Sequence, residues 1–342
     1  MQQVALNLSS YSTKKLYFKG KDEDSKKLPI LPPDSFEKKD ALENFKEMKV
    51  PVHKLLGKNK YKLTIVDQFQ GGKLNEKKWN LGHPYAPANE NPFNNEMQKY
   101  DRSTAGNEHV VLDKRGFLRL KATKDEDGTI KSGAVNTKGK YNHTYGYWEI
   151  RAKIPAGNGT WPALWTHADP TKDKHGWMPE FDILESGGGN GIEKAFGFEH
   201  KKSYGTVTNN LITRKNPSQV WSPEYTVGYP YKDGSPKNKE IEPFHFSKDF
   251  HRYGMEWKPE SVAFYLDGKK IRQINKHVET IPQIFIANVA VGGDYTGIKN
   301  PDEVLKNGPA EMDIDYVAAW APEKEPIKQK HNFHYKTKKP NL

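Results

Sequence analysis

The chain contains no cysteine, which excludes a disulfide framework and thiol catalysis, although it does not fix the cell compartment. No run approaches the ~18 apolar residues of a membrane-spanning helix. The apolar stretch at residues 4–8 is too short and too polar for the core of a secretion signal, so no signal peptide is visible. Gly-rich phosphate loops, Cys/His metal-ligand spacings and internal repeats are also missing. We therefore expect no membrane association and no phosphate-loop nucleotide site.

The formal net charge of +11 would suit an anionic partner, but the excess lies at the two ends of the chain. Residues 1–60 carry 13 Lys against 8 acidic residues, and residues 321–342 carry 6 Lys against 2 Glu. The part between them is nearly balanced, with 35 basic and 33 acidic residues. Lysine-rich chain ends are usually solvated segments. We expect residues 1–60 to form a basic extension or linker, residues 322–342 a basic tail, and no nucleic-acid partner.

From Tyr61 onward the sequence reads as short strands separated by turns, with few helical windows. Asp267-Gly268 is typical of a hairpin turn between two strands. Ile284–Val291 is almost continuously apolar, which indicates a strand covered on both faces. The pattern predicts an all-β sandwich of two sheets over residues 61–321. The loop-rich span 203–245 is expected to wall one end of a cleft. The expected strands include 63–66, 110–112, 118–120, 147–154, 261–266, 270–271 and 312–320.

Three carboxylates lie within six residues in Glu180-Phe181-Asp182-Ile183-Leu184-Glu185. The large apolar residues between them favour an extended strand, in which Glu180 and Asp182 share a face. Glu185 is five positions from Glu180 and would point the other way on a regular strand. One bulged residue, at Ile183 or Leu184, would turn all three acids to one surface.

Such a surface suits glycoside hydrolysis. Retaining glycosidases need a carboxylate nucleophile and a protonated carboxylic acid beside the bond that is cleaved. A third acid between them would hold the nucleophile and raise the pKa of the acid. On the acid spacing alone, a solvated acidic strand face or a cation site is the favoured alternative, and the rest of the sequence reverses this.

Aromatic residues upstream support a sugar site. Flat indole faces suit the C–H faces of sugar rings, and Trp161 and Trp165 lie four residues apart in Trp-Pro-Ala-Leu-Trp. We expect one indole, that of Trp161, in the cleft and the other in the core. Trp177, three residues before Glu180, is a further candidate for sugar contact.

Together these segments resemble glycoside hydrolase family 16, in the laminarinase-like branch with the bulged acid motif. The resemblance extends over roughly residues 64–321. Beyond the acids and the Trp-Pro-Ala-x-Trp segment, it is carried by residues 67–79, 94–100, 132–154, 253–259, 288–293 and 313–317.

The resemblance implies a jelly-roll sandwich of two curved antiparallel sheets with a concave substrate cleft, and endo-hydrolysis of a β-linked polysaccharide with retention. Carried over, Glu180 is the nucleophile, Asp182 its helper and Glu185 the general acid/base. No cofactor is required.

The same resemblance implies the sugar-contacting residues. Trp161 would stack near the cleaved bond; from their positions in the sequence, Trp165 and Trp177 are further candidate contacts. Asn95 would hydrogen-bond a sugar on the non-reducing side, next to Glu96 in the same cleft-lining stretch. His200 matches a family histidine near the leaving group, although a buried core histidine is the alternative. Some members bind a structural calcium, with an Asp like Asp315 among its ligands.

Two departures bear on the substrate. Pro179 stands where laminarinases usually have Gly, and Ala134 stands where many have an Arg that would contact sugar. We expect a β-1,3-glucan or mixed-linkage β-1,3/1,4-glucan as substrate. An endo-β-galactanase for agar, porphyran or carrageenan and a non-catalytic carbohydrate-binding protein stay open, as does attachment to a larger assembly. Because the expected substrate is a polysaccharide, we expect the protein to act outside the cell or at its surface. We also expect a monomer.

Overall fold

The computed structural model describes residues 61–322, apart from 71, 87–91, 156, 158, 170–178, 188–207, 213–245, 248, 276–277 and 279. Trp177 and His200 lie outside the described residues, as do residues 1–60, 323–342 and most of the 203–245 span. Within the described part, no helix has the length and apolar character needed to span a bilayer.

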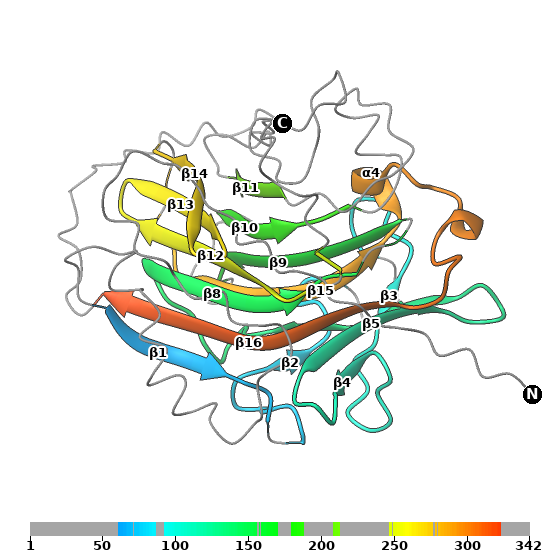
Figure 1. Cartoon of the computed structure of the whole chain (residues 1–342). Coiled ribbons are helices and arrows are strands. Elements are labelled where there is room, and N and C mark those ends of the chain that lie inside the picture. The colour runs from blue at the N-terminus through cyan, green and yellow to red at the C-terminus, as the bar shows by residue number, and fades with distance from the viewer. Residues whose placement is uncertain are drawn as a thin grey trace, which may run out of the picture.

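Two stacked sheets make up the described part of the molecule, which confirms the predicted all-β sandwich (Figure 1). The larger sheet has ten strands in the order β14-β13-β12-β8-β16-β5-β6-β3, with β1 also paired to β16 and β4 to β5. Its strands are β1 (Tyr61–Asp67), β3 (Lys99–Tyr100), β4 (Val110–Leu112), β5 (Leu118–Lys124), β6 (Ile130–Ser132), β8 (Gly146–Lys153), β12 (His251–Lys258), β13 (Ser261–Leu266), β14 (Lys269–Ile274) and β16 (Ala310–Pro322). The pairings are antiparallel except for the short parallel contact between β3 and β6.

The smaller sheet has six strands in the order β11-β10-β9-β15-β7-β2, all antiparallel. They are β2 (Asn80–Leu81), β7 (Ala134–Asn136), β9 (Thr160–Ala168), β10 (Glu180–Glu185), β11 (Thr208–Ile212) and β15 (Gln283–Val291). β11 is an edge strand inside the 203–245 span, which the sequence predicts to be a loop. Pairing with β10 rather than a local alternating pattern accounts for this strand.

The core lies between the two sheets, and alternation along the strands decides which side chains enter it. In β5, Leu118, Leu120 and Ala122 are buried in the core while the residues between them are half-buried. β15 is buried on both faces, as predicted: Phe285, Ala287, Val289 and Val291 belong to the core. The alternate residues of β15 therefore line the other face of the smaller sheet.

Short connections complete the frame. Asp267 and Gly268 both have positive φ, 49° and 81°, and join β13 to β14 as the predicted Asp-Gly hairpin. The short helix α4 (Gly293–Thr296) follows β15 directly and lies at one end of β9 (Figure 1). A 3₁₀ turn, η3 (Pro301–Glu303), leads on toward β16.

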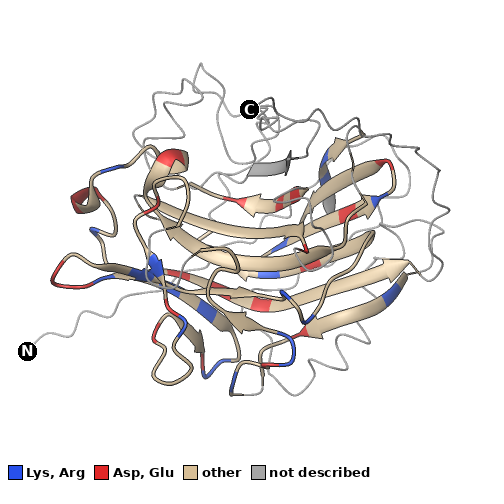
Figure 2. Ribbon diagram, turned by 180° about the vertical axis from the view of Figure 1, so that it is seen from behind, with Lys and Arg blue, Asp and Glu red and all other residues tan. Residues whose placement is uncertain are grey.

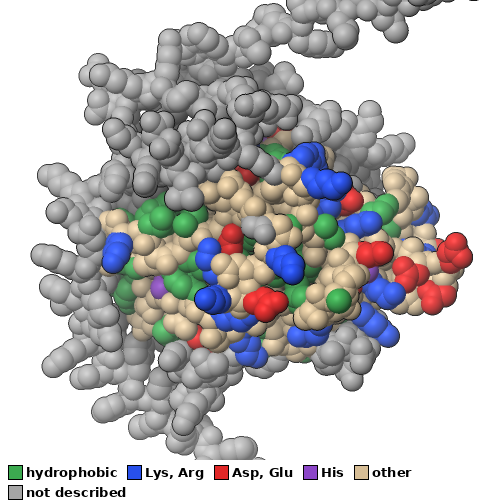
Figure 3. All heavy atoms as spheres, turned by 90° about the horizontal axis from the view of Figure 1, so that it is seen from below, with side chains coloured by type: hydrophobic (Ala, Val, Ile, Leu, Met, Phe, Trp, Pro, Cys, Tyr) green, Lys and Arg blue, Asp and Glu red, His purple; other side chains and the backbone are tan. Residues whose placement is uncertain are grey.

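Charge on the described part of the fold is mixed in sign. Acidic and basic positions both occur on the strands of the larger sheet, and further acidic positions lie on β10 and on the turns (Figure 2). The face in Figure 3 shows Lys and Arg side chains interspersed with Asp and Glu. This mixture fits the near balance of charges in the middle of the sequence.

Candidate active site

A bulge in β10 turns its three acids to one face. Against β9, Glu180 pairs with His167, Asp182 with Trp165 and Glu185 with Ala163, so four residues of β10 beginning at Asp182 face only three of β9. The pairing passes from Asp182 to Leu184 and skips Ile183, which confirms the predicted irregularity.

The apolar residues of β10 occupy the opposite face. Phe181, Ile183 and Leu184 all belong to the core between the sheets. We call the face of the smaller sheet turned away from this core, on which Glu180, Asp182 and Glu185 lie, the site face. Asp182 is 2% exposed and Glu185 7% exposed, whereas Glu180 is half-buried. The acids therefore line a sheltered surface rather than a solvated strand face.

Burial raises the pKa of each of the three carboxyls. Burial raises the pKa of Glu180 to about 7, partly offset by a hydrogen bond with Asp182. For Asp182, burial and then the charges of Glu185 and Glu180 raise the pKa well above its usual range. Burial and the charge of Glu180 raise the pKa of Glu185 to about 8, although the hydrogen bond from Trp161 opposes the rise. Near neutral pH the arrangement therefore favours protonated Asp182 and Glu185 beside an ionisable Glu180.

Both tryptophans of the Trp-Pro-Ala-x-Trp segment lie half-buried on the site face. The Trp161 indole donates a hydrogen bond from Nε1 to Glu185 Oε1 at 3.0 Å. Trp165 Nε1 donates to Asn288 Oδ1 at 2.8 Å. The expectation that one of the two would enter the core is wrong, because residues four apart on a regular strand point to the same face.

Asn95 and Glu96 lie at the end of the site face next to α4. Asn95 is in the left-handed region, with φ of 57°, and its Nδ2 donates to Asp294 Oδ2 at 2.9 Å. Glu96 Oε2 accepts from Gln98 Nε2 at 2.6 Å. Burial raises the pKa of Glu96 to about 7, and the charge of Glu96 in turn helps to raise the pKa of Glu185. Glu96 therefore lies near the acids, while the amide of Asn95 ties the rim to α4.

An open depression of about 650 Å³ adjoins these two residues. Its lining includes Phe93, which is 44% exposed, and Lys299, whose Nζ lies 3.2 Å from Asp294 Oδ1. The remaining lining residues are Pro92, Asn94, Asn95, Glu96 and Met97.

The other end of the site face carries residues that the sequence analysis did not single out. The His83 ring stacks on Tyr100, with centroids 5.5 Å apart, and lies 5.6 Å from the Trp165 ring. Tyr85 Oη is 2.9 Å from His167 Nδ1. Burial, followed by the charges of Asp169 and Glu180, raises the pKa of Tyr85, which places its hydroxyl near Glu180.

Only part of this group had a local signal. His167 follows Trp161 and Trp165 at alternate positions of β9, so strand periodicity was sufficient to place it on the site face. His83 and Tyr85 are brought there by pairing of β2 with β7, which no local pattern indicates.

Asp315, the expected calcium ligand, lies on β16 and forms an ion pair with Arg151, with Oδ2 2.6 Å from Nη1. Among the described residues no group of three His, Cys, Asp or Glu side chains is arranged to hold a metal ion. The expected calcium site at Asp315 stays a prediction.

Neighbouring carboxyls and indoles on one sheltered face of a two-sheet sandwich suit a glycosidase. The model of glycosyl hydrolases family 16 matches residues 97–318, and the chain belongs to this family. The membership and the two stacked sheets agree with the expected jelly roll.

Curated relatives include glucan endo-1,3-beta-glucosidase A1 of Niallia circulans, 28% identical over 285 residues, which cover 74% of this chain and 37% of the relative. The beta-glucanase of Rhodothermus marinus is 28% identical over 281 residues, covering 76% of this chain and 85% of the relative. The chain thus spans little more than a third of the first relative's length and most of the second's.

Among solved structures, the catalytic domain of an endo-1,3-beta-glucanase (laminarinase) from Thermotoga petrophila superimposes with a TM-score of 0.56. It is 25% identical, and the match covers 78% of this chain and all of that domain.

Proposed function

We propose that this protein is a retaining endo-β-glucanase that hydrolyses β-1,3-glucan or mixed-linkage β-1,3/1,4-glucan by double displacement. The observation that carries the proposal is the bulge at Ile183, which brings Glu180, Asp182 and Glu185 to one sheltered face of a family 16 sandwich. The glucanase names of the relatives support the substrate class.

In the first step the Glu180 carboxylate attacks the anomeric carbon and forms a glycosyl ester. Glu185, protonated near neutral pH because burial raises its pKa, donates its proton to the departing glycosidic oxygen. In the second step the ionised Glu185 takes a proton from water, which attacks the same carbon and releases Glu180. Two inversions give overall retention of configuration.

Asp182 helps to keep the nucleophile Glu180 ionised. Burial and the charges of Glu185 and Glu180 raise the pKa of Asp182 well above its usual range, so Asp182 retains a proton. The hydrogen bond between Asp182 and Glu180 lowers the pKa of Glu180 and opposes the effect of burial. Glu180 therefore ionises while its neighbour remains neutral.

The site face offers sugar contacts on both sides of the acids. Trp165, His83 and Tyr85 supply aromatic and polar surface beyond Glu180. On the Glu185 side lie Trp161, Glu96 and the depression that contains Phe93. Position 134, where many laminarinases have an arginine, holds an alanine that is fully buried against Ala86 and Tyr100. This position therefore supplies no arginine to the site face.

We keep three further expectations as proposals. The catalytic domain spans residues 61–321, between a basic extension and a basic tail. The enzyme acts as a monomer, and it works outside the cell or at its surface, because an intact polysaccharide does not enter a cell. Light scattering and assay of culture fractions test the last two, and a dimer or purely intracellular activity would contradict them.

The substrate test compares reducing-sugar release from laminarin, lichenan, agarose and porphyran. We expect release from laminarin, lichenan or both, and products whose anomeric configuration by NMR is initially β. Release only from agarose or porphyran would replace the glucanase by a galactanase. Binding to laminarin that survives Glu180→Gln, with no cleavage by either protein, would indicate a carbohydrate-binding protein.

A further inference from the structure

Trp161 makes two contacts that together define its orientation. The edge of its indole donates through Nε1 to Glu185 Oε1 at 3.0 Å. One face of the same indole lies flat against the ring of Tyr295, with centroids 4.5 Å apart and planes inclined by 11°. The indole is therefore held both by its edge and by one face.

Tyr295 comes from a part of the chain distant from β9 in sequence. It lies in α4, which directly follows β15, the strand that pairs Ala290 with Trp161. The hydrogen bond from Gly292 N to Gly159 O, 2.7 Å long, continues this pairing to the start of α4. The pairing of β15 with β9 thus places the Tyr295 ring at the end of β9 where Trp161 lies.

The backbone of α4 is fixed on its other side by the segment containing Asn94 and Asn95. Asp294 N donates to Asn94 O at 2.8 Å, and the Asp294 carboxylate binds Asn95 and Lys299. Gly293 has φ of 82°, and a Cβ there would lie 2.7 Å from Asn94 O, so the close approach requires glycine. α4 is therefore anchored by contacts on both sides despite its short length.

We propose that Tyr295 is a positioning residue for the reaction: its ring fixes the plane of Trp161 and thereby aims the indole N–H at Glu185. The inference rests on the proposed function, in which Glu185 is the acid/base. Rotation of the indole away from Glu185 would break the stack with Tyr295. Because Tyr295 covers one indole face, only the other face is available to a sugar.

This role has a consequence that a purely structural role would not have. The indole N–H stabilises the ionised form of Glu185 and lowers its pKa. Without the stack the N–H points at Glu185 for less of the time. The pKa of Glu185 should then rise, and the alkaline limb of the kcat/KM profile should move to higher pH.

The experiment measures kcat, KM and the pH profile on laminarin and lichenan for the full chain and for Tyr295→Leu and Tyr295→Phe. Tyr295→Leu removes the stack, and we expect kcat to fall on the order of tenfold to a hundredfold because the acid is misplaced. We expect KM to change little and the alkaline limb to rise by about one pH unit, the effect of one hydrogen bond to a charged group. Tyr295→Phe keeps the ring and should behave like the wild type.

Trp161→Phe provides an independent check, because it removes the N–H itself. It should raise the alkaline limb by the same amount, and adding Tyr295→Leu should move it no further. If Tyr295→Leu does not fold, as judged by thermal unfolding, Tyr295→Met replaces it with a side chain of similar length.

Three outcomes would overturn the inference. A wild-type pH profile and kcat in Tyr295→Leu would do so. A rise in KM alone would make Tyr295 a direct sugar contact. Equal losses in Tyr295→Phe and Tyr295→Leu would assign the effect to the hydroxyl rather than the ring. Failure of the glucanase proposal is distinguishable, because the wild type would then be inactive on both polymers.

Discussion

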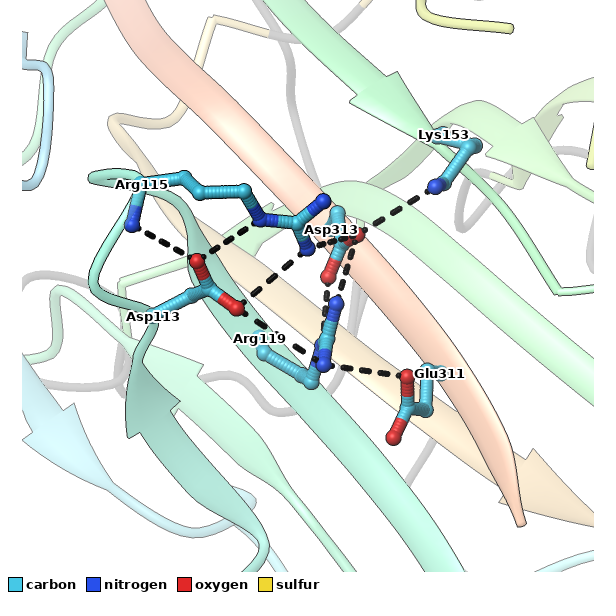
Figure 4. A network of polar contacts seen from close by, with 6 residues as sticks. All are labelled: Asp113, Arg115, Arg119, Lys153, Glu311 and Asp313. Atoms are coloured by element: carbon cyan, nitrogen blue, oxygen red, sulfur yellow. Dashed lines mark hydrogen bonds and ion pairs between the residues drawn. The ribbon is translucent and has the colours of Figure 1, made fainter. Parts of the chain in front are cut away.

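Two faces of this molecule carry clustered acids, which are paired with cations on one face and lie beside other acids on the other. On the outer face of the larger sheet, Arg119 binds Asp313 through both oxygens, at 2.7 and 2.9 Å, with Lys153 and Arg115 nearby (Figure 4). On the site face, Glu180, Asp182 and Glu185 lie beside one another.

The pKa shifts follow this difference. On the outer face, the hydrogen bond from Arg115 is the largest cause that lowers the pKa of Asp113, and the bond to Asp313 raises that of Arg119. On the site face, burial dominates and raises the pKa of all three carboxyls. The comparison shows that cations fix carboxylates as structural charges, whereas burial beside other acids makes them proton carriers near neutral pH.

The largest expected effect comes from removing the nucleophile. Glu180→Gln should lower kcat by about 10⁴-fold or more, because no covalent intermediate can form, while laminarin binding stays nearly unchanged. Glu185→Gln should lower kcat by a similar factor on natural substrates. Glu260→Gln, in the exposed turn after β12, is the matched control and should retain full activity. Comparable activity in Glu180→Gln and the control would remove Glu180 from the reaction.

Breaking the outer network should affect stability and not chemistry. Asp313→Asn leaves Arg119 with weaker partners, and we expect a loss of about 2 to 3 kcal/mol in the free energy of unfolding. Denaturant titration measures this loss, and kcat of the folded protein should remain that of the wild type. Glu311→Gln removes a more exposed partner of Arg119 and should cost under about 1 kcal/mol. A fall in kcat of Asp313→Asn without loss of stability would erase the distinction between the two faces.

The pH dependence of kcat/KM reports the ionisation of the acids on the site face. Activity requires ionised Glu180, so kcat/KM should rise with pH up to about 7. It also requires protonated Glu185, so kcat/KM should fall above about 8. Beyond each limb the loss should approach about tenfold per pH unit. A maximum near pH 5, close to the ordinary pKa of a glutamic acid, would contradict the burial that distinguishes the site face.

The smallest expected effect concerns the depression at the end of the site face. Phe93→Ala should raise KM for long oligosaccharides by about two- to tenfold, the value of one aromatic contact, with kcat unchanged. Leu63→Ala is the control, because Leu63 is similarly exposed at 39% but lies on β1 of the other sheet. Equal KM values for the two variants on chains of increasing length would place the polymer elsewhere.

Residue patterns were sufficient for the strands expected from the sequence and for the acid triplet. Alternation of apolar and polar residues predicted which strand faces are buried. Glu180 and Glu185 are five residues apart and would point to opposite faces of a regular strand, so placing both acids on one face predicted a bulge between them. The Asp267-Gly268 turn was equally local.

What local patterns could not provide depends on contacts between distant segments. Tyr295 meets Trp161 only because β15 pairs with β9, and His83 reaches Trp165 from a different strand. The β11 strand likewise owes its structure to β10 rather than to its own residues. Trp165 is a different case, because strand periodicity alone places it on the same face as Trp161.

The most direct test of the account is to trap the covalent intermediate. A slow 2-deoxy-2-fluoro laminarin-oligosaccharide donor should label the full chain once, and peptide mass spectrometry should place the sugar on Glu180. Labelling should disappear in Glu180→Gln and persist in Glu260→Gln. A sugar attached to Glu185 or to any other residue would contradict the assignment made here.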